Sequence, residues 1–227
     1  MTSGSSTGLL TLSQLPLFPL NTVLFPGGWM PLRIFEVRYL DMIGRCHRAG
    51  APFGIVCLSE GHEVRKADPQ GGGDSPFAKE SFHPVGVLAR IESLEKPQPG
   101  LLMIRCQGMQ RFHVDRRQQL PHGLWVADVT LDAPEPAVPV PDHLDGARNR
   151  LKQLLMNLRE RQPEVLAQLP LQEPYQWNDC GWVANRWAEL LPAPAELKQR
   201  LMSLDNPLLR LELVADLLDR LGLDGDA

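Results

Sequence analysis

The sequence predicts an α+β fold: an amino-terminal antiparallel β pseudo-barrel with one crossover helix, followed by a carboxy-terminal α-helical bundle. Up to position 132, apolar residues fall in short runs or alternate with polar ones, as in strands. Beyond position 142 they recur at helical spacing. Between the halves, Ala133–Pro141 holds prolines at 134, 136, 139 and 141, which predicts a semi-rigid linker. The predicted parts are a disordered tail (1–11), the barrel (12–132), the linker (133–141) and the bundle (142–227).

The stretch Leu15–Glu36 is the densest apolar run of the chain, and four prolines and a Gly-Gly turn interrupt it. Because each proline removes a backbone donor and fixes φ, the run cannot be one helix. It is also too interrupted to cross a membrane. It therefore predicts two short buried strands at the edges or bulges of a small barrel. These are Leu15–Leu20 continuing into Val23–Phe25, and Trp29–Ile34 after the turn Pro26–Gly28.

The remaining elements of the barrel follow from periodicity and turn residues. An apolar arc at helical spacing predicts a helix over Glu36–Arg48, stopped by Gly50. Further strands are predicted over Pro52–Ser59, Phe82–Glu95, Leu101–Val114 and Leu124–Leu131, with a turn at Pro97–Gly100 and a bulge at Gly108. Between them, Glu60–Ser81 is rich in charge, Gly and Pro, which predicts a long mobile loop.

Four amphipathic stripes predict the bundle. The first helix is expected to be capped by Asp142 and stopped by Pro163, with a short turn over Glu164–Leu169 after it. Asn178 or Asp179 is expected to cap the second helix, and Pro194 to stand in the first turn of the third. The last helix opens at Asp205-Asn206-Pro207 and ends at Gly222.

Charge and cysteine usage restrict the function classes. The net charge of −4 creates no global field that would draw the chain to nucleic acid or to an anionic membrane. No segment reads as a signal peptide or a membrane span, and the four cysteines lie dispersed in apolar runs. The sequence therefore predicts a cytoplasmic protein that does not enter a membrane and whose cysteines are reduced and buried.

Catalytic and metal-binding motifs give no support for an enzyme. The six histidines are scattered, and C-x-x-C and H-E-x-x-H are missing, so we expect no metal and no cofactor. A G-x-S-x-G string at Gly4–Gly8 lacks the strand that a nucleophile elbow needs. Ser93 and Lys96 match S-x-x-K, but on a strand residues three apart point to opposite faces. We interpret both strings as coincidences.

Three stretches carry a resemblance to a known family. They are LPLFPLNTVLFPG with MPLRIFE, then VGVLARIESLEKPQPGLLMIRCQGMQRFHV, and last GWVANRWAELLPAPAELKQRLMSLDNPLLRLELV. In the second stretch the matching positions are Gly86, Gly108, Arg111 and Phe112. From Leu15 to about Leu221 the chain resembles the amino-terminal, substrate-binding domain of Lon protease. The resemblance implies a PUA-like pseudo-barrel followed by a helical subdomain.

The resemblance also implies a function. Full-length Lon has an ATPase module with a Walker A loop and a peptidase module with a serine–lysine pair, and this sequence shows neither. We therefore expect a non-catalytic module that binds polypeptide, such as an unfolded or tagged substrate or a partner protein, through an exposed apolar surface. Candidate contacts are Trp29, Met30 and Phe35 around the first turn, and Met156 and Trp182, which lie opposite the apolar arcs of their helices. Each could instead pack between barrel and bundle.

Two further functions remain open from the sequence. PUA-like barrels occur in RNA-binding proteins, and Arg105, Arg111, Arg116 and Arg117 form a basic stripe with Phe112 among them. The net negative charge and only five lysines argue against a broad phosphate-binding surface. A scaffold that binds a partner in an unknown assembly is the other alternative. The oligomeric state does not follow from the sequence.

Overall fold

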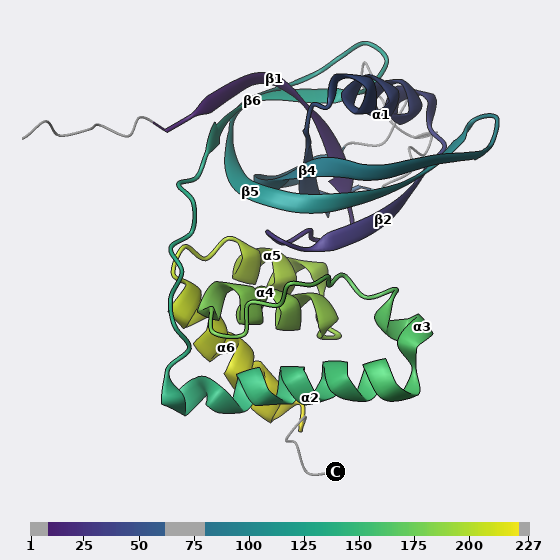
Figure 1. Cartoon of the computed structure of the whole chain (residues 1–227). Coiled ribbons are helices and arrows are strands. Elements are labelled where there is room, and N and C mark those ends of the chain that lie inside the picture. Colours follow the sequence, from purple (N-terminus) through teal and green to yellow (C-terminus); the bar gives the residue numbers. More distant parts are fainter. Residues whose placement is uncertain (1–8, 62–79, 223–227) are drawn as a thin grey trace, which may run out of the picture.

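The computed structural model of the protein describes residues 9–61 and 80–222. Six strands form a closed barrel, and the helices of the bundle pack below it in the view of Figure 1. The strands are β1 (Thr11–Leu20), β2 (Trp29–Ile34), β3 (Phe53–Glu60), β4 (Ser81–Gln98), β5 (Leu101–Gln119) and β6 (Trp125–Leu131). Helix α1 (Val37–Ala49) lies on the barrel, away from the bundle. The predicted fold class, a β-barrel followed by a helical bundle, is confirmed.

The sheet order is β2-β5-β4-β3-β1-β6, and an additional β5–β6 pairing closes the barrel. The long strand β5 serves two partners, because its first half pairs with β2 and its second half with β6. One pairing differs from the prediction of an antiparallel barrel: β1 and β3 run parallel. The reason is the connection between them, since β2 and α1 form a crossover that brings the chain back in its original direction.

Several boundaries differ from those predicted. Strand β1 ends at Leu20, so Val23–Phe25 is a buried loop. Strand β4 extends beyond its predicted end to Gln98, which pairs with Leu101 of β5, and β5 extends beyond Val114 to Gln119 because its last residues pair with β6. β1 already begins at Thr11, so the predicted tail is too long. The rest of that tail up to Gly8, and the predicted loop from 62 to 79, lie outside the described residues.

Gly108 joins the barrel to the turn before β2. The N–H of Gly27 donates to the carbonyl of Gly108 at 2.8 Å, and the N–H of Gly108 donates to the carbonyl of Gly28 at 2.8 Å. A Cβ on Gly108 would lie 2.2 Å from the carbonyl oxygen of Phe25, so only glycine permits this approach. The register of β4 and β5 shifts beside Gly108, which confirms the predicted bulge.

The bundle consists of α2 (Asp145–Arg161), α3 (Pro163–Leu166), α4 (Cys180–Leu190), α5 (Ala195–Met202) and α6 (Pro207–Arg220). Asp179 caps α4 by accepting from the N–H of Trp182 at 2.6 Å. Asn206 caps α6 by accepting from the N–H groups of Leu208 and Leu209. The predicted cap at Asp142 is wrong. That residue starts a 3₁₀ turn, Asp142–Leu144, which precedes α2.

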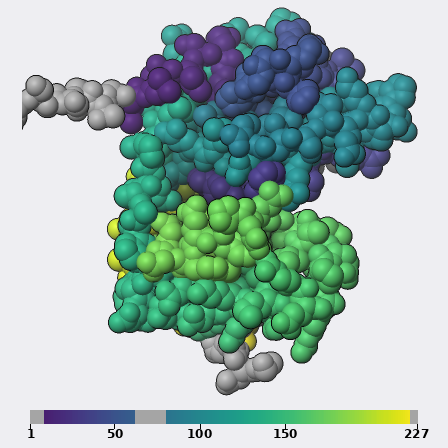
Figure 2. Space-filling model, in the orientation of Figure 1, coloured from purple at the N-terminus to yellow at the C-terminus, as the bar shows by residue number. Residues whose placement is uncertain are grey.

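Barrel and bundle share one apolar core. A single cluster of buried side chains runs from Phe18 and Phe53 in the barrel to Val183 and Leu211 in the bundle. The proline-rich segment lies along both halves as a packed strap (Figure 2). Val140 is buried, and the carbonyl of Val138 accepts from the N–H of Cys180 at 2.8 Å. The four cysteines are buried, and no described helix is long and apolar enough to cross a bilayer.

Candidate functional site

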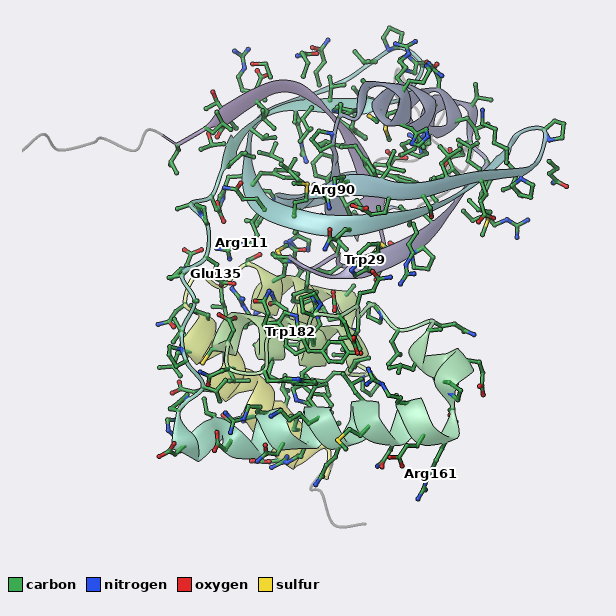
Figure 3. The ribbon with its side chains drawn as sticks, in the orientation of Figure 1. Trp29, Arg90, Arg111, Glu135, Arg161 and Trp182 are labelled. Carbon is green, nitrogen blue, oxygen red and sulfur yellow. The ribbon has the colours of Figure 1, made fainter. Side chains whose placement is uncertain are left out.

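Of the five apolar candidates from the sequence, Trp29 lies on the side of the barrel nearest the bundle and Trp182 lies in the bundle (Figure 3). Phe35 directly follows β2 and is 51% exposed, and Met156 on α2 is 61% exposed. Trp29 and Met30 at the start of β2 are half-buried, as is Trp182 in the first turn of α4. Helix α2 forms the side of the bundle opposite the barrel, so Met156 does not adjoin Phe35.

Trp29 contacts both halves of the protein. Its backbone N–H donates to the carbonyl of Pro170 in the bundle at 3.2 Å. The guanidinium of Arg105 on β5 lies 4.8 Å from the centre of its indole ring, within cation–π distance. The next residue, Met30, packs against the shared core. Trp29 therefore reaches the bundle through its backbone, and Met30 contributes its side chain to the shared core.

Trp182 belongs to an aromatic cluster with Tyr175 and Trp177. The ring centres lie 5.2 Å apart for Trp177–Trp182, 5.8 Å for Tyr175–Trp182 and 5.0 Å for Tyr175–Trp177. These are packing distances for tilted and edge-to-face rings, and they leave no space among the rings for a ligand. Trp182 also packs against the shared core. The cluster therefore holds the segment before α4 against that helix.

Phe35 borders a groove beside β2. The groove has a volume of about 340 Å³, and β1, β2 and the first turn of α1 line it. Its apolar lining includes Phe18, Leu20, Leu32, Phe35 and Tyr39. Val37, at the start of α1, is 80% exposed close by. An apolar groove with exposed apolar residues at its border is typical of a surface that contacts another molecule.

No described strand pairs with the outer edge of the strand beside this groove. Among the described residues β2 pairs with β5 alone, and their register runs without a bulge from Trp29 to Ile34. Because the N–H of Trp29 points away from β5 to Pro170, alternation places the N–H of Arg33 on that same outer side. Pro31, between them, has no N–H to offer. The outer edge of β2 thus presents the backbone of Arg33 beside the apolar groove.

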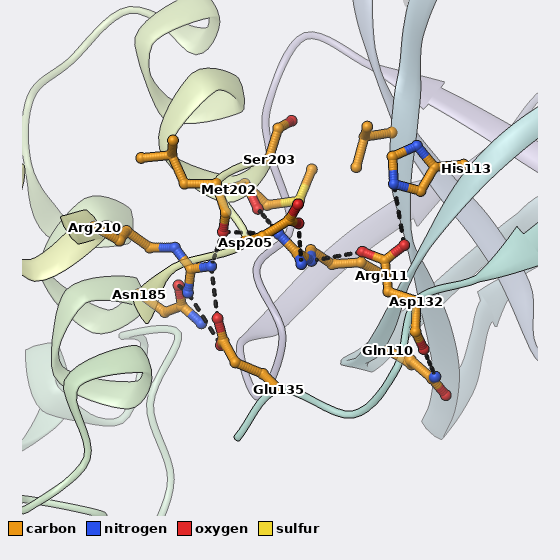
Figure 4. Close-up of polar contacts among 12 residues, drawn as sticks. Gln110, Arg111, His113, Asp132, Glu135, Asn185, Met202, Ser203, Asp205 and Arg210 are labelled. Carbon is orange, nitrogen blue, oxygen red and sulfur yellow. Dashed lines mark hydrogen bonds and ion pairs between the residues drawn. The ribbon is translucent and has the colours of Figure 1, made fainter. Parts of the chain in front are cut away.

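The basic stripe predicted on β5 does not form. Arg111 is only 8% exposed, so its assignment to an RNA-binding surface is wrong. It forms ion pairs with Asp132 at 3.0 Å and Asp205 at 2.8 Å, and it donates to the carbonyls of Met202 and Leu204 (Figure 4). Phe112, the aromatic residue of that stripe, is fully buried. Strand alternation predicts which face of the sheet a residue lies on, but it does not predict that a segment distant in the sequence covers that face.

The other arginines of that stripe divide between stacking and exposure. Arg105 stacks on Trp29, as described above. The guanidinium of Arg117 lies 4.7 Å from the ring centre of Phe82 and 5.7 Å from that of Trp125. Arg116 is exposed. Two of these cations therefore cover aromatic side chains of the protein itself.

A second polar network ties the proline-rich strap to the bundle (Figure 4). Arg210 of α6 is 1% exposed and forms an ion pair with Glu135 at 2.7 Å. It also donates to Asn185 Oδ1 at 3.1 Å and to the carbonyl of Leu201 at 3.0 Å. Arg210 and Arg111 thus place two buried cations at the junction, and each is paired with a carboxylate.

A buried ion pair that the sequence did not reveal holds the turn before β2. Arg186 and Glu189 of α4 lie 2.8 Å apart, and Arg186 donates to the carbonyl of Pro26 at 2.9 Å. Burial raises the pKa of Glu189 to about 8, although Arg186 and Lys198 oppose the shift. In the sequence, the only sign of this pair is the i,i+3 spacing of Arg186 and Glu189. Because pairs at this spacing mostly lie on exposed helix faces, the spacing did not predict a buried pair.

The described residues show no group suited to metal or thiol chemistry. No three His, Cys, Asp or Glu side chains gather there in a way that could hold a metal ion. Burial raises the pKa of Cys106 to about 12 and that of Cys180 to about 11. Both thiols are therefore protonated near neutral pH and are poor nucleophiles.

Comparison with known proteins gives a family and a fold. The family model of the ATP-dependent protease La (LON) substrate-binding domain matches residues 14–220. Lon protease of Anaeromyxobacter dehalogenans is 29% identical over 210 residues, and Lon protease 2 of Myxococcus xanthus is 28% identical over 215 residues. Each match covers 91% of this chain and 23% of the relative. The chain therefore spans about a quarter of the length of these relatives.

Solved structures agree with this match. A Lon N-terminal domain protein from Xanthomonas campestris has a TM-score of 0.69 and 28% identity, over 90% of this chain and 98% of that one. The N-terminal domain of Mycobacterium avium complex Lon protease has a TM-score of 0.55 and 18% identity, over 89% and 96% of the two chains. At that identity the second likeness shows the fold alone.

Proposed function

Because the chain belongs to the family of the ATP-dependent protease La (LON) substrate-binding domain, we propose that it is a non-catalytic module that binds an extended stretch of another polypeptide along the outer edge of β2. The bound segment adds a strand to the sheet and places apolar side chains in the adjoining groove. This mode of recognition combines backbone hydrogen bonds with pockets for alternate side chains.

The observation that carries this proposal is the contact between Trp29 and Pro170. A segment of the bundle already accepts a hydrogen bond from the outer side of β2 at 3.2 Å, so this edge can pair with a chain. Beyond that contact the edge continues to Ile34 with an apolar groove beside it. Pro31 supplies no donor, which limits pairing along the edge and protects it from uncontrolled aggregation.

Phe35 is the side chain that we assign to ligand contact. It is 51% exposed and lines the groove. Trp29 and Met30 support the proposed surface from within the junction, and Trp182 does so through its aromatic cluster. Met156 lies on the opposite side of the bundle and is left out. RNA binding is not proposed, because Arg111 is buried and Arg105 and Arg117 stack on the protein's own aromatic rings.

The test is binding of a permanently unfolded model chain, reduced and carboxymethylated α-lactalbumin, measured by fluorescence anisotropy. Burial of a phenylalanine contributes about 1.5–3 kcal/mol, so Phe35→Asp should weaken binding about tenfold or more. Met156→Asp is the matched control, since it introduces the same charge at an exposed apolar position on α2. Equal affinities for the two variants would place the binding surface elsewhere. Circular dichroism should show that both variants keep the fold.

A further inference from the structure

A second hollow lies between α1 and the tip of the β4–β5 hairpin. Its volume is about 640 Å³, and Leu40, Leu94, Leu101 and Leu102 give it an apolar floor. It lies close to the groove beside β2, because Leu102, which lines the hollow, pairs across the sheet with Ile34, which lines the groove. A chain bound along β2 therefore has a second apolar surface next to it.

The rim of this hollow carries an excess of positive charge. His47, Arg48 and Lys96 line it, and all three are exposed. The described residues give none of them an acidic partner. Asp41, the one acidic side chain in the lining, is paired with Arg45 at 2.7 Å. In a chain of net charge −4, this is a local basic rim above a leucine floor.

We propose that this hollow binds acidic side chains of the same polypeptide, so that the protein prefers apolar segments that carry Asp and Glu. The inference rests on the proposed function and names its substrate class. Carboxylates complement Arg48 and Lys96, while the leucines accept the neighbouring apolar side chains. The lining holds no Phe, Tyr or Trp on which a nucleobase could stack, which favours a polypeptide over a single-stranded nucleic acid.

Gly44 gives the hollow its depth. It stands in the middle of α1 and lines the hollow, and a Cβ there would meet only Nη1 of Arg48, at 3.4 Å. A larger side chain at this position would project into open space and occupy the hollow without changing its charge. Glycine in a helix interior is less stable than alanine by roughly 0.5–1 kcal/mol, so Gly44→Leu should keep the fold.

The experiment compares two labelled peptides of equal length, one alternating leucine with glutamate and the other leucine with lysine. The wild-type protein should bind the Leu/Glu peptide about tenfold more tightly at low ionic strength, and added salt should reduce the difference. The double variant Arg48→Glu/Lys96→Glu should lose this preference. Gly44→Leu should weaken binding of the Leu/Glu peptide. Arg161→Glu is the control, since it reverses a charge in the last turn of a helix in the bundle, away from the barrel (Figure 3).

Several results would overturn the inference. The first is that the wild type binds both peptides equally. The second is that Arg48→Glu/Lys96→Glu keeps the wild-type preference for the Leu/Glu peptide. The third is that the wild type binds polyuridylic acid more tightly than the Leu/Glu peptide, and that the double variant abolishes this binding. If the peptides fail in this way while Phe35→Asp still weakens binding of the unfolded chain, the proposed function stands and only its substrate class is wrong. If the wild type binds neither peptide nor the unfolded chain, both proposals fail.

Discussion

The guanidinium of Arg186 and the carboxyl group of Glu189 lie 2.8 Å apart on α4, with their side chains 1% and 6% exposed. Arg186 also donates to the carbonyl of Pro26 at 2.9 Å, so the pair holds the turn that leads into β2. The start of the proposed binding edge is thus fixed by the bundle as well as by the barrel. Substitutions at Glu189 and Gly28 therefore test stability, whereas a substitution at Arg33 of β2 tests binding.

Glu189 should make stability depend on pH. Its pKa is raised from 4.5 to about 8 by burial, so between these values the folded protein binds a proton that the unfolded chain releases. The free energy of unfolding should therefore fall as pH rises through this window. Glu189→Gln should remove that component, and thermal unfolding followed by circular dichroism across the window checks it. An identical pH dependence in variant and wild type would contradict the assignment.

Gly28 should not tolerate a side chain. A Cβ there would lie 1.9 Å from Oε1 of Glu189 and 3.0 Å from the carbonyl oxygen of Phe25. Gly28→Ala should destabilise the protein by about 1–3 kcal/mol, since overpacking forces neighbouring atoms to move. Gly146→Ala on α2, where a Cβ meets only Nη2 of Arg150 at 3.6 Å, should be neutral or slightly stabilising. Urea unfolding of both variants measures the difference.

Glu135 should contribute to stability through Arg210. Their ion pair is 2.7 Å long, and Arg210 is 1% exposed. Glu135→Ala leaves this buried cation with only neutral partners and should cost about 2 kcal/mol, less than for a fully buried pair because Glu135 is partly exposed. Glu173→Ala removes the partner of Arg159 in an exposed pair and should cost below about 1 kcal/mol. Equal losses in urea unfolding would mean that the strap is not held by this contact.

Arg33 should supply the backbone donor of the binding edge. Arg33→Pro removes an N–H that faces outward and leaves the hydrogen bonds to β5 in place. We expect binding of the unfolded chain to weaken by about three- to tenfold, as for the loss of one hydrogen bond of roughly 1 kcal/mol, with little change in thermal stability. Arg33→Ala, which keeps the N–H, should bind more tightly than Arg33→Pro. The reverse order in an anisotropy titration would exclude pairing along β2.

Periodicity predicted most elements because it reflects local geometry. The strands of the barrel and the four main helices occur where apolar spacing predicted them, and Asp179 caps α4 as expected. The predicted cap at Asp142 failed because a 3₁₀ turn precedes the helix and moves its N-cap by two residues, from Asp142 to Leu144. The parallel pairing of β1 with β3 escaped prediction, because strand direction follows from the path of the crossover and not from side-chain alternation.

The sequence by itself determined the family and the two-part fold, and it named Phe35 as one of five candidates for an apolar contact surface. Only the tertiary structure decided the roles of the other candidates. Arg111 became a buried junction residue because Asp205, 94 positions away, meets it across the boundary between barrel and bundle. Likewise, the outer edge of β2 and the basic rim near Lys96 exist only after distant segments pack together. Spacing along a chain records which face a residue occupies, whereas exposure depends on what covers that face.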